Sequence, residues 1–226
     1  MPLIETVDQD HFATIEMFRS LAMETDRFER YTHPHATRVA AIADEIGKSY
    51  QLGPRDRLSL RVAALAHDLG EAMMARDYIE RPGPLRNDER TDLARHPLLG
   101  EHEAAEAGAD RGAQLLVRWH HEWWNGDGYP DGLRFEQIPL GARILHVADA
   151  YAALTDERPF RPALSEKEAR DHLLEWIGVE FDPSVVKALL SLEPFKELTS
   201  HYVEATPPDI ASIADELMGR IDQLGT

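Results

Sequence analysis

The chain carries two adjacent pairs of side chains that can ligate metal ions: a histidine–aspartate pair inside an apolar stretch, and a histidine–histidine pair just before a glycine-rich loop. Three further residues of the same chemistry stand in segments that can be helical. Imidazole and carboxylate groups suit iron, manganese, zinc or nickel, and this set is large enough for two ions that share one carboxylate. The candidate ligands are His35, His67, Asp68, His96, His120, His121 and Asp149.

Length and composition favour a soluble enzyme. The 226 residues are 43% hydrophobic and 29% charged, which is ordinary for a globular domain with a sizeable core. The absence of cysteine excludes a disulfide framework and fits a reducing compartment. The net charge of −17 opposes binding to nucleic-acid polymers and anionic membranes, although a local site can still take a small anion. We therefore expect a cytoplasmic protein that binds neither a nucleic-acid polymer nor a membrane.

Helical spacing of apolar residues recurs along the chain, and no strand-like alternation persists. The spacing predicts helices over residues 10–24, 35–50, 55–76, 111–121, 140–156 and, near the end, roughly 209–223. Turn-rich runs predict loops over residues 80–86 and 125–132. Capping residues and prolines predict further helices from Asn87 to Leu93, from Pro97, from Ser165 to Ile177, and from Asp182. The fold class predicted from these patterns is all-α.

His67 and Asp68 fall near the middle of the predicted helix over residues 55–76, beside apolar residues such as Leu65 and Leu69. A carboxylate without a partner would be costly in such a stripe, so Asp68 needs a compensating group. A metal ion is one such group, and an arginine is the alternative.

Several motifs follow one another between residues 31 and 190. They are HATRVA (35–40), HDLGE (67–71), His96-Pro97 with Gly100, HHEWWNGDGYP (120–130), IPLGARILHVADAYAALTDERPFR (138–161) and FDPSVV (181–186). In this order they resemble the HD-GYP family, whose members are helical metal-dependent phosphodiesterases that open cyclic di-GMP to linear pGpG or GMP. The resemblance implies an HD-domain helical bundle with additional C-terminal helices. It divides the chain into an N-terminal helical extension (1–30), a catalytic domain (31–200) and a C-terminal helix packed on that domain (201–226).

The resemblance also implies two transition-metal ions and a hydroxide that bridges them and attacks the phosphodiester. Metal ions are what this reaction needs, because the charge of a phosphodiester repels an anionic nucleophile. We expect iron or manganese, with zinc or nickel as alternatives. Asp68 would bridge the two ions, the first of which would also be held by His35, His67 and Asp149, and the second by His96, His120 and His121.

Further roles come from the same resemblance. Arginine side chains suit bidentate contacts with phosphate oxygens, and the family carries basic residues of this kind after its last aspartate ligand. Asp68 and Glu71 are the expected catalytic residues. The expected substrate-binding residues are Gly128, Tyr129 and Pro130 of the glycine-rich loop, together with Arg158 and Arg161.

Two positions depart from the family pattern. Glu71 stands where the family has a lysine, so the charge beside the expected phosphate position is reversed. Glu71 could instead orient a ligand or bind metal. Tyr31 stands one helical turn before His35, where some members carry a glutamate that is associated with a third metal ion. A site for two ions is therefore the expectation here.

Two other functions compete with a cyclic-dinucleotide phosphodiesterase. One is a di-iron oxygenase, because some HD-domain proteins use the same ligand types to activate oxygen; the GYP loop counts against it. The other is a noncatalytic sensor or interaction module that keeps its metals for stability, and Glu71 is its main support. The expected partner is a small anionic nucleotide, and a homodimer or a separate signalling protein stays open as a further partner.

Overall fold

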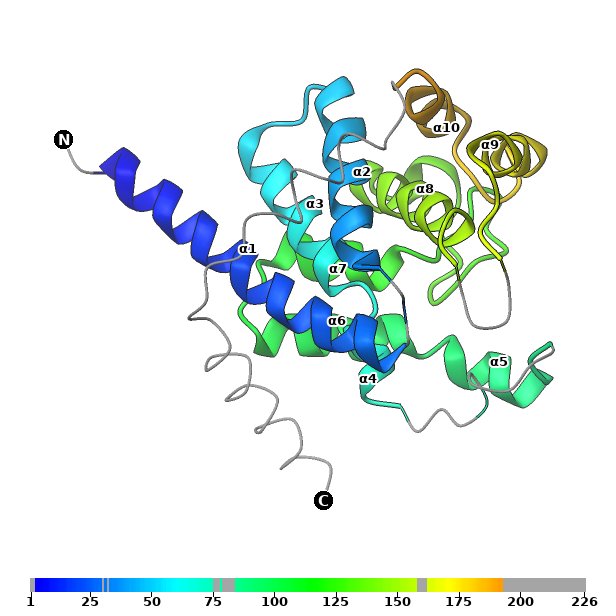
Figure 1. The fold of residues 1–226 in the computed structure, drawn as a ribbon, viewed down its shortest axis with the longest axis horizontal. Coiled ribbons are helices and arrows are strands. Elements are labelled where there is room, and N and C mark those ends of the chain that lie inside the picture. Colours follow the sequence, from blue (N-terminus) through cyan, green and yellow to red (C-terminus); the bar gives the residue numbers. More distant parts are fainter. Residues whose placement is uncertain are drawn as a thin grey trace.

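The computed structural model describes residues 3–29, 31, 33–74, 78, 84–157 and 162–192, with side chains from residue 11 onward. This part of the chain contains no strand, only an isolated bridge between Ile177 and Phe181, so the all-α prediction is confirmed. The expected helix over residues 209–223, Arg158 and Arg161 lie outside the described residues. The helices (Figure 1) are α1 (Leu3–Phe28), α2 (His35–Ser49), α3 (Pro54–Ala66), α4 (Leu69–Ala72), α5 (Asn87–Leu93), α6 (His96–Glu106), α7 (Arg111–Trp119), the short 3-10 helix η1 (Phe135–Gln137), α8 (Leu140–Leu154), α9 (Glu166–Glu175) and α10 (Pro183–Leu190).

The centre of the bundle is formed by α2, α3 and α8, which pack against one another. Small residues line their contacts: Ala40 and Ala43 of α2 and Ala63 and Ala64 of α3 are buried. Because interaxial distance depends on the side chains at a helix contact, these alanines allow close approach. Around this centre, α7 packs on α3 and α6 on α7. The helix α1 lies against α2, α3 and α4, and its N-terminal half extends away from the bundle in Figure 1.

The prediction of one helix over residues 55–76 is wrong, because the chain turns at His67 and Asp68. Asp68 leaves the helical region, with φ −99° and ψ 7°, and α4 begins at the next residue. On an unbroken helix, adjacent side chains would point about 100° apart. The turn instead brings Nε2 of His67 within 2.9 Å of Oδ2 of Asp68. The break therefore lets two neighbouring residues face the same space.

Other helix bounds also differ from the prediction, and α1 spans Leu3–Phe28 where residues 10–24 were expected. Asn87 is the first residue of α5 rather than its cap; the buried Glu89 carboxylate accepts the backbone N–H of Arg86 at 2.7 Å. The helix α7 ends at Trp119, so both residues of the double histidine stand in the turn that follows it. Among the described helices, none has both the length and the apolarity to cross a membrane.

Candidate metal centre

Three of the candidate ligands stand just after the last turn of a helix: His67 after α3, His96 after α5 and His120 after α7. The last carbonyl groups of a helix have no partner within the helix, so a ring N–H can bind there. In each case Nδ1 lies next to the carbonyl oxygen three residues back and must donate its proton to it. This leaves Nε2 of each ring as an acceptor. The three Nδ1···O distances are 2.9 Å to Ala64, 2.8 Å to Leu93 and 2.6 Å to Val117.

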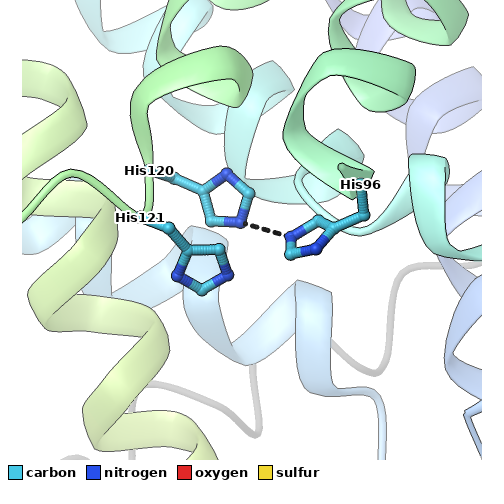
Figure 2. A group of neighbouring side chains, drawn as sticks. All are labelled: His96, His120 and His121. Carbon is cyan, nitrogen blue, oxygen red and sulfur yellow. Dashed lines mark hydrogen bonds between the residues drawn. The ribbon is translucent and has the colours of Figure 1, made fainter. Parts of the chain in front are cut away.

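The Nε2 atoms of His96 and His120 face each other (Figure 2) and are 3.3 Å apart. With both rings neutral, two lone pairs meet, which is unfavourable unless a proton or a cation lies between them. Burial, helped by the nearby His96 and His67, lowers the pKa of His120 to about 3, so this ring is neutral at physiological pH. Nε2 of His67 is also buried and lies 2.9 Å from Oδ2 of Asp68. These inward-facing Nε2 atoms fit a divalent metal ion.

The candidate ligands form two groups, in each of which the ligand atoms lie within 4.8 Å of one another. In the first, Nε2 of His35 is 3.1 Å from Oδ1 of Asp149, and Nε2 of His67 is 3.7 Å from the same oxygen. The second is formed by His96, His120 and His121. The structure therefore brings all the predicted ligand residues together from α2, α6, α8 and the turns after α3 and α7.

Asp68 lies between the two groups. Its Oδ2 is 2.9 Å from Nε2 of His67, and its Oδ1 is 3.7 Å from Nε2 of His96. One carboxylate thus offers one oxygen to each group. This arrangement suits a carboxylate shared by two cations, whose mutual repulsion it would reduce.

The field of the site favours positive charge. Burial acts to raise the pKa of Asp68, but His67 and the other nearby histidines outweigh it and hold the pKa well below its usual value. The same balance, with His35 and His67 as the partners, lowers the pKa of Asp149. Burial acts to lower the pKa of His67, yet Asp68 and Asp149 raise it to about 10. Two ionised carboxylates that can hold a proton this firmly can also attract a divalent cation.

The glycine-rich loop is tied back to the ligands by Glu122, which is 2% exposed. Its carboxylate accepts the backbone N–H groups of Asp131, Gly132 and Leu133 at 2.6, 3.1 and 2.9 Å. The backbone at Gly128 packs directly against the backbone of Trp123. A Cβ atom at Gly128 would lie 2.2 Å from the backbone nitrogen of Trp123, so only glycine fits this position. Sequence reasoning missed the role of Glu122, although it stands directly after the double histidine.

Tyr129 and Pro130 stand where this loop meets the site. The Tyr129 ring centroid is 5.0 Å from that of His121 and 6.3 Å from that of His96. Burial, and then the carboxylate of Glu71, raises the pKa of Tyr129, so its phenol stays a neutral hydrogen-bond donor. The loop therefore places a proton donor beside the candidate ligands.

Glu71 is buried beside the second group of ligands. Its Oε1 lies 3.7 Å from Nδ1 of His96, and together with Asp68 and His96 it forms a third set of potential metal-binding atoms. His146, which is not one of the candidate ligands, is buried with Nδ1 3.0 Å from the Glu122 carbonyl oxygen and Nε2 3.2 Å from Oε1 of Glu180.

A model of the HD domain family matches residues 19–185. The chain therefore belongs to the HD domain family, and the resemblance to its HD-GYP branch is confirmed. The matched region begins within α1, before the first candidate ligand.

Three curated relatives are similar to this chain. It is 35% identical to a cyclic di-GMP phosphodiesterase of Vibrio cholerae, over 63% of this chain and 31% of that protein. It is 34% identical to the cyclic di-GMP phosphodiesterase response regulator RpfG of Xanthomonas campestris pv. campestris, over 77% and 47%. It is 32% identical to 3'3'-cGAMP-specific phosphodiesterase 3 of Vibrio cholerae, over 70% and 35%. The chain spans about a third to a half of the length of these relatives.

Among solved structures, the fold is similar to that of a cyclic GMP-AMP specific phosphodiesterase of Vibrio cholerae. The TM-score is 0.72 at 20% sequence identity, and the match covers 94% of this chain and 60% of that one. This similarity confirms the HD-domain helical fold.

Proposed function

We propose that this chain is a metal-dependent phosphodiesterase that hydrolyses a cyclic dinucleotide. The observation that carries the proposal is the placement of Asp68 between two groups of buried nitrogen and oxygen atoms, with a carboxylate oxygen toward each. The family and the named relatives support the same reaction class. We propose iron or manganese, since the donors are imidazole and carboxylate without thiolate.

The candidate ligands divide between two metal ions, and Asp68 is shared by both. When bound, two such ions acidify a water molecule and neutralise charge on the phosphodiester. The turns at the helix ends fix the rings of His67, His96 and His120, so their Nε2 atoms need no rearrangement to bind metal. The first ion would be held by His35, His67, Asp68 and Asp149, and the second by Asp68, His96, His120 and His121.

Substrate contacts are proposed for the GYP loop and for two arginines. Gly128, Tyr129 and Pro130 shape the edge of the site, and the neutral phenol of Tyr129 can donate a hydrogen bond to a phosphate oxygen. Arg158 and Arg161 follow α8, whose Asp149 is a ligand, and they are proposed to contact phosphate.

The relatives point to two candidate substrates, cyclic di-GMP and 3'3'-cGAMP. We propose cyclic di-GMP as the preferred one, hydrolysed to pGpG or GMP. Glu71 is proposed as a catalytic residue. It lies beside His96, at the position where the family has a lysine.

An assay with the purified chain tests the proposal. Protein loaded anaerobically with Mn²⁺ or Fe²⁺ is incubated with cyclic di-GMP, 3'3'-cGAMP or cyclic di-AMP, and products are separated by chromatography. We expect linear product from at least one guanine-containing substrate and none from the Asp68→Ala variant. Tight binding without turnover would instead indicate a noncatalytic sensor. Oxygen consumption without phosphodiester cleavage would indicate the oxygenase alternative.

A further inference from the structure

His35 differs from His67, His96 and His120 in how its ring is held. It is the first residue of α2, and the start of a helix offers unpaired N–H groups instead of carbonyl oxygens. Its Nε2 faces Asp149, while its Nδ1 is buried and has no hydrogen-bond partner among the described residues. No backbone carbonyl therefore orients this ring, so its orientation must come from the surrounding side chains and from the placement of α2 itself.

Two residues at the C-terminal end of α1 and just beyond it contact His35 and its neighbour Ala36. The Tyr31 ring stacks on the His35 ring, with centroids 4.2 Å apart and planes 2° from parallel. Asp26, on the last turns of α1, is only 8% exposed, and its two carboxylate oxygens lie 3.3 and 3.4 Å from the backbone nitrogen of Ala36. The backbone of Asp26 also accepts the N–H of Tyr31 at 3.0 Å.

Asp26, a residue of α1, caps the N-terminus of α2. Pro34 precedes α2 and has no side-chain acceptor, and the first turn of α2 carries no acidic residue of its own. The Asp26 carboxylate fills this gap by accepting an N–H group of the first turn, where negative charge is also favoured by the helix dipole. It thereby fixes the position of the residue next to His35.

We propose that Asp26 is a positioning residue for the first metal site, acting through His35. This inference rests on the proposed function, because it assumes that His35 binds an ion. It also places the C-terminal end of α1 within the catalytic unit rather than in a separate extension of residues 1–30. The start of the family match at residue 19, inside α1, agrees with this division.

Charge near the site supports the same role. Burial raises the pKa of Asp26 to about 6, and the main opposing influence is His35. The Asp26 carboxylate therefore lies within the electrostatic reach of the ligand that it is proposed to position. Partners of metal-binding histidines typically affect metal affinity by about tenfold to a hundredfold. For an indirect partner we expect the lower end of that range.

The experiment is a Mn²⁺ titration of metal-free full-length protein. Asp26→Asn is expected to lower the affinity for one of the two ions about tenfold and to leave the affinity for the other unchanged. Asp26→Glu keeps the charge and is expected to recover most of the lost affinity. Glu24→Gln is the matched control, because Glu24 is a carboxylate on the same helix that pairs with Arg27 in solvent. If Asp26 acts through His35, the effect of Asp26→Asn disappears in a His35→Ala background.

Wild-type protein that binds two ions, with Asp26→Asn binding them equally well, would overturn the inference. So would an equal effect of Asp26→Asn with and without His35. Wild-type protein that binds no Mn²⁺ would overturn the proposed function instead. In that case, metal-free protein with ¹⁵N-labelled histidine provides the test by NMR: Asp26→Asn is expected to shift the His35 ring signals and not those of His120. Unchanged His35 signals would overturn the inference whether or not metal binds.

Discussion

Oε1 of Glu71 lies 3.7 Å from Nδ1 of His96, so a buried carboxylate stands against a candidate ligand ring at the position where the family has lysine. A carboxylate here would repel the phosphate of the proposed substrate. At about 4 Å and an effective dielectric of 20, two like charges repel by about 4 kcal/mol, which is an upper guide because solvent and neighbouring charges screen it.

Glu71→Lys is therefore expected to lower the KM for cyclic di-GMP by about tenfold, which corresponds to about 1.4 kcal/mol. Glu71→Gln separates the loss of the negative charge from the gain of a positive one and should fall between wild type and the lysine variant. Steady-state kinetics and elemental analysis of both variants are the measurements. Loss of metal or activity in Glu71→Lys would mean that the carboxylate serves the site's own chemistry and that another substrate must be sought.

Asp68→Ala is expected to lose both ions, whereas His96→Ala should chiefly weaken the binding of one, because Asp68 presents one oxygen to each group of ligands. Elemental analysis of aerobic and anaerobic preparations provides the measurement, with close to two ions per chain expected in wild type. His102→Ala is the control, since His102 lies on α6 with His96 but is exposed. Retention of one ion by the Asp68→Ala variant would show that this carboxylate does not bridge the two ions.

The candidate ligands could be picked out from the sequence because each is a histidine or aspartate that stands in one of the motifs shared with the family. The break between α3 and α4 could not, since Leu65, Ala66 and Leu69 continue the helical apolar spacing through it. The roles of Glu122 and Asp26 were also missed. Both carboxylates accept backbone N–H groups about ten positions away, and a backbone partner at that separation leaves no signature in the sequence.

Arg158→Ala and Arg161→Ala are each expected to weaken the binding of cyclic di-GMP without changing metal content. A charge-assisted hydrogen bond contributes about 1.5–3 kcal/mol, so the dissociation constant should rise about tenfold to a hundredfold. Isothermal titration with catalytically inactive protein measures the change. Arg55→Ala, at an exposed position of α3, provides a control. Equal affinities for wild type and both variants would place the ligand elsewhere.

Gly128→Ala is expected to displace the GYP loop, because the new Cβ would lie 2.2 Å from one backbone atom and 2.5 Å from the carbonyl oxygen of His121. A destabilisation of about 2–3 kcal/mol lowers the Tm of a chain this size by about 5–10 °C. Gly53→Ala is the matched control, since its Cβ would approach nothing closer than 3.8 Å. Thermal unfolding followed by circular dichroism makes the comparison. Equal Tm values for the two variants would show that the backbone contact at Gly128 can shift to admit a Cβ atom.

The affinity for Mn²⁺ should rise with pH, because binding must displace a proton from His67. The nearby carboxylates Asp68 and Asp149 overcome burial and raise its pKa to about 10. In the metal-free protein, this group's contribution to stability is complete below about pH 6.5, the pKa of a free histidine, and is lost as the pH rises through about 10. Over the same range the apparent affinity should increase by up to about tenfold per pH unit. Titration calorimetry in buffers of different ionisation enthalpy counts the released protons; a count of zero would contradict the prediction.

The backbone carbonyls that hold His67, His96 and His120 also set how basic these rings are, and no substitution of a side chain can remove them. His35 has no such carbonyl, since its surroundings are Tyr31 and the end of α1. Substitutions that change metal preference are therefore expected to act more strongly around His35 than around these three rings. An engineer who wishes to exchange one metal for another should randomise the neighbours of His35 and leave the helix ends alone.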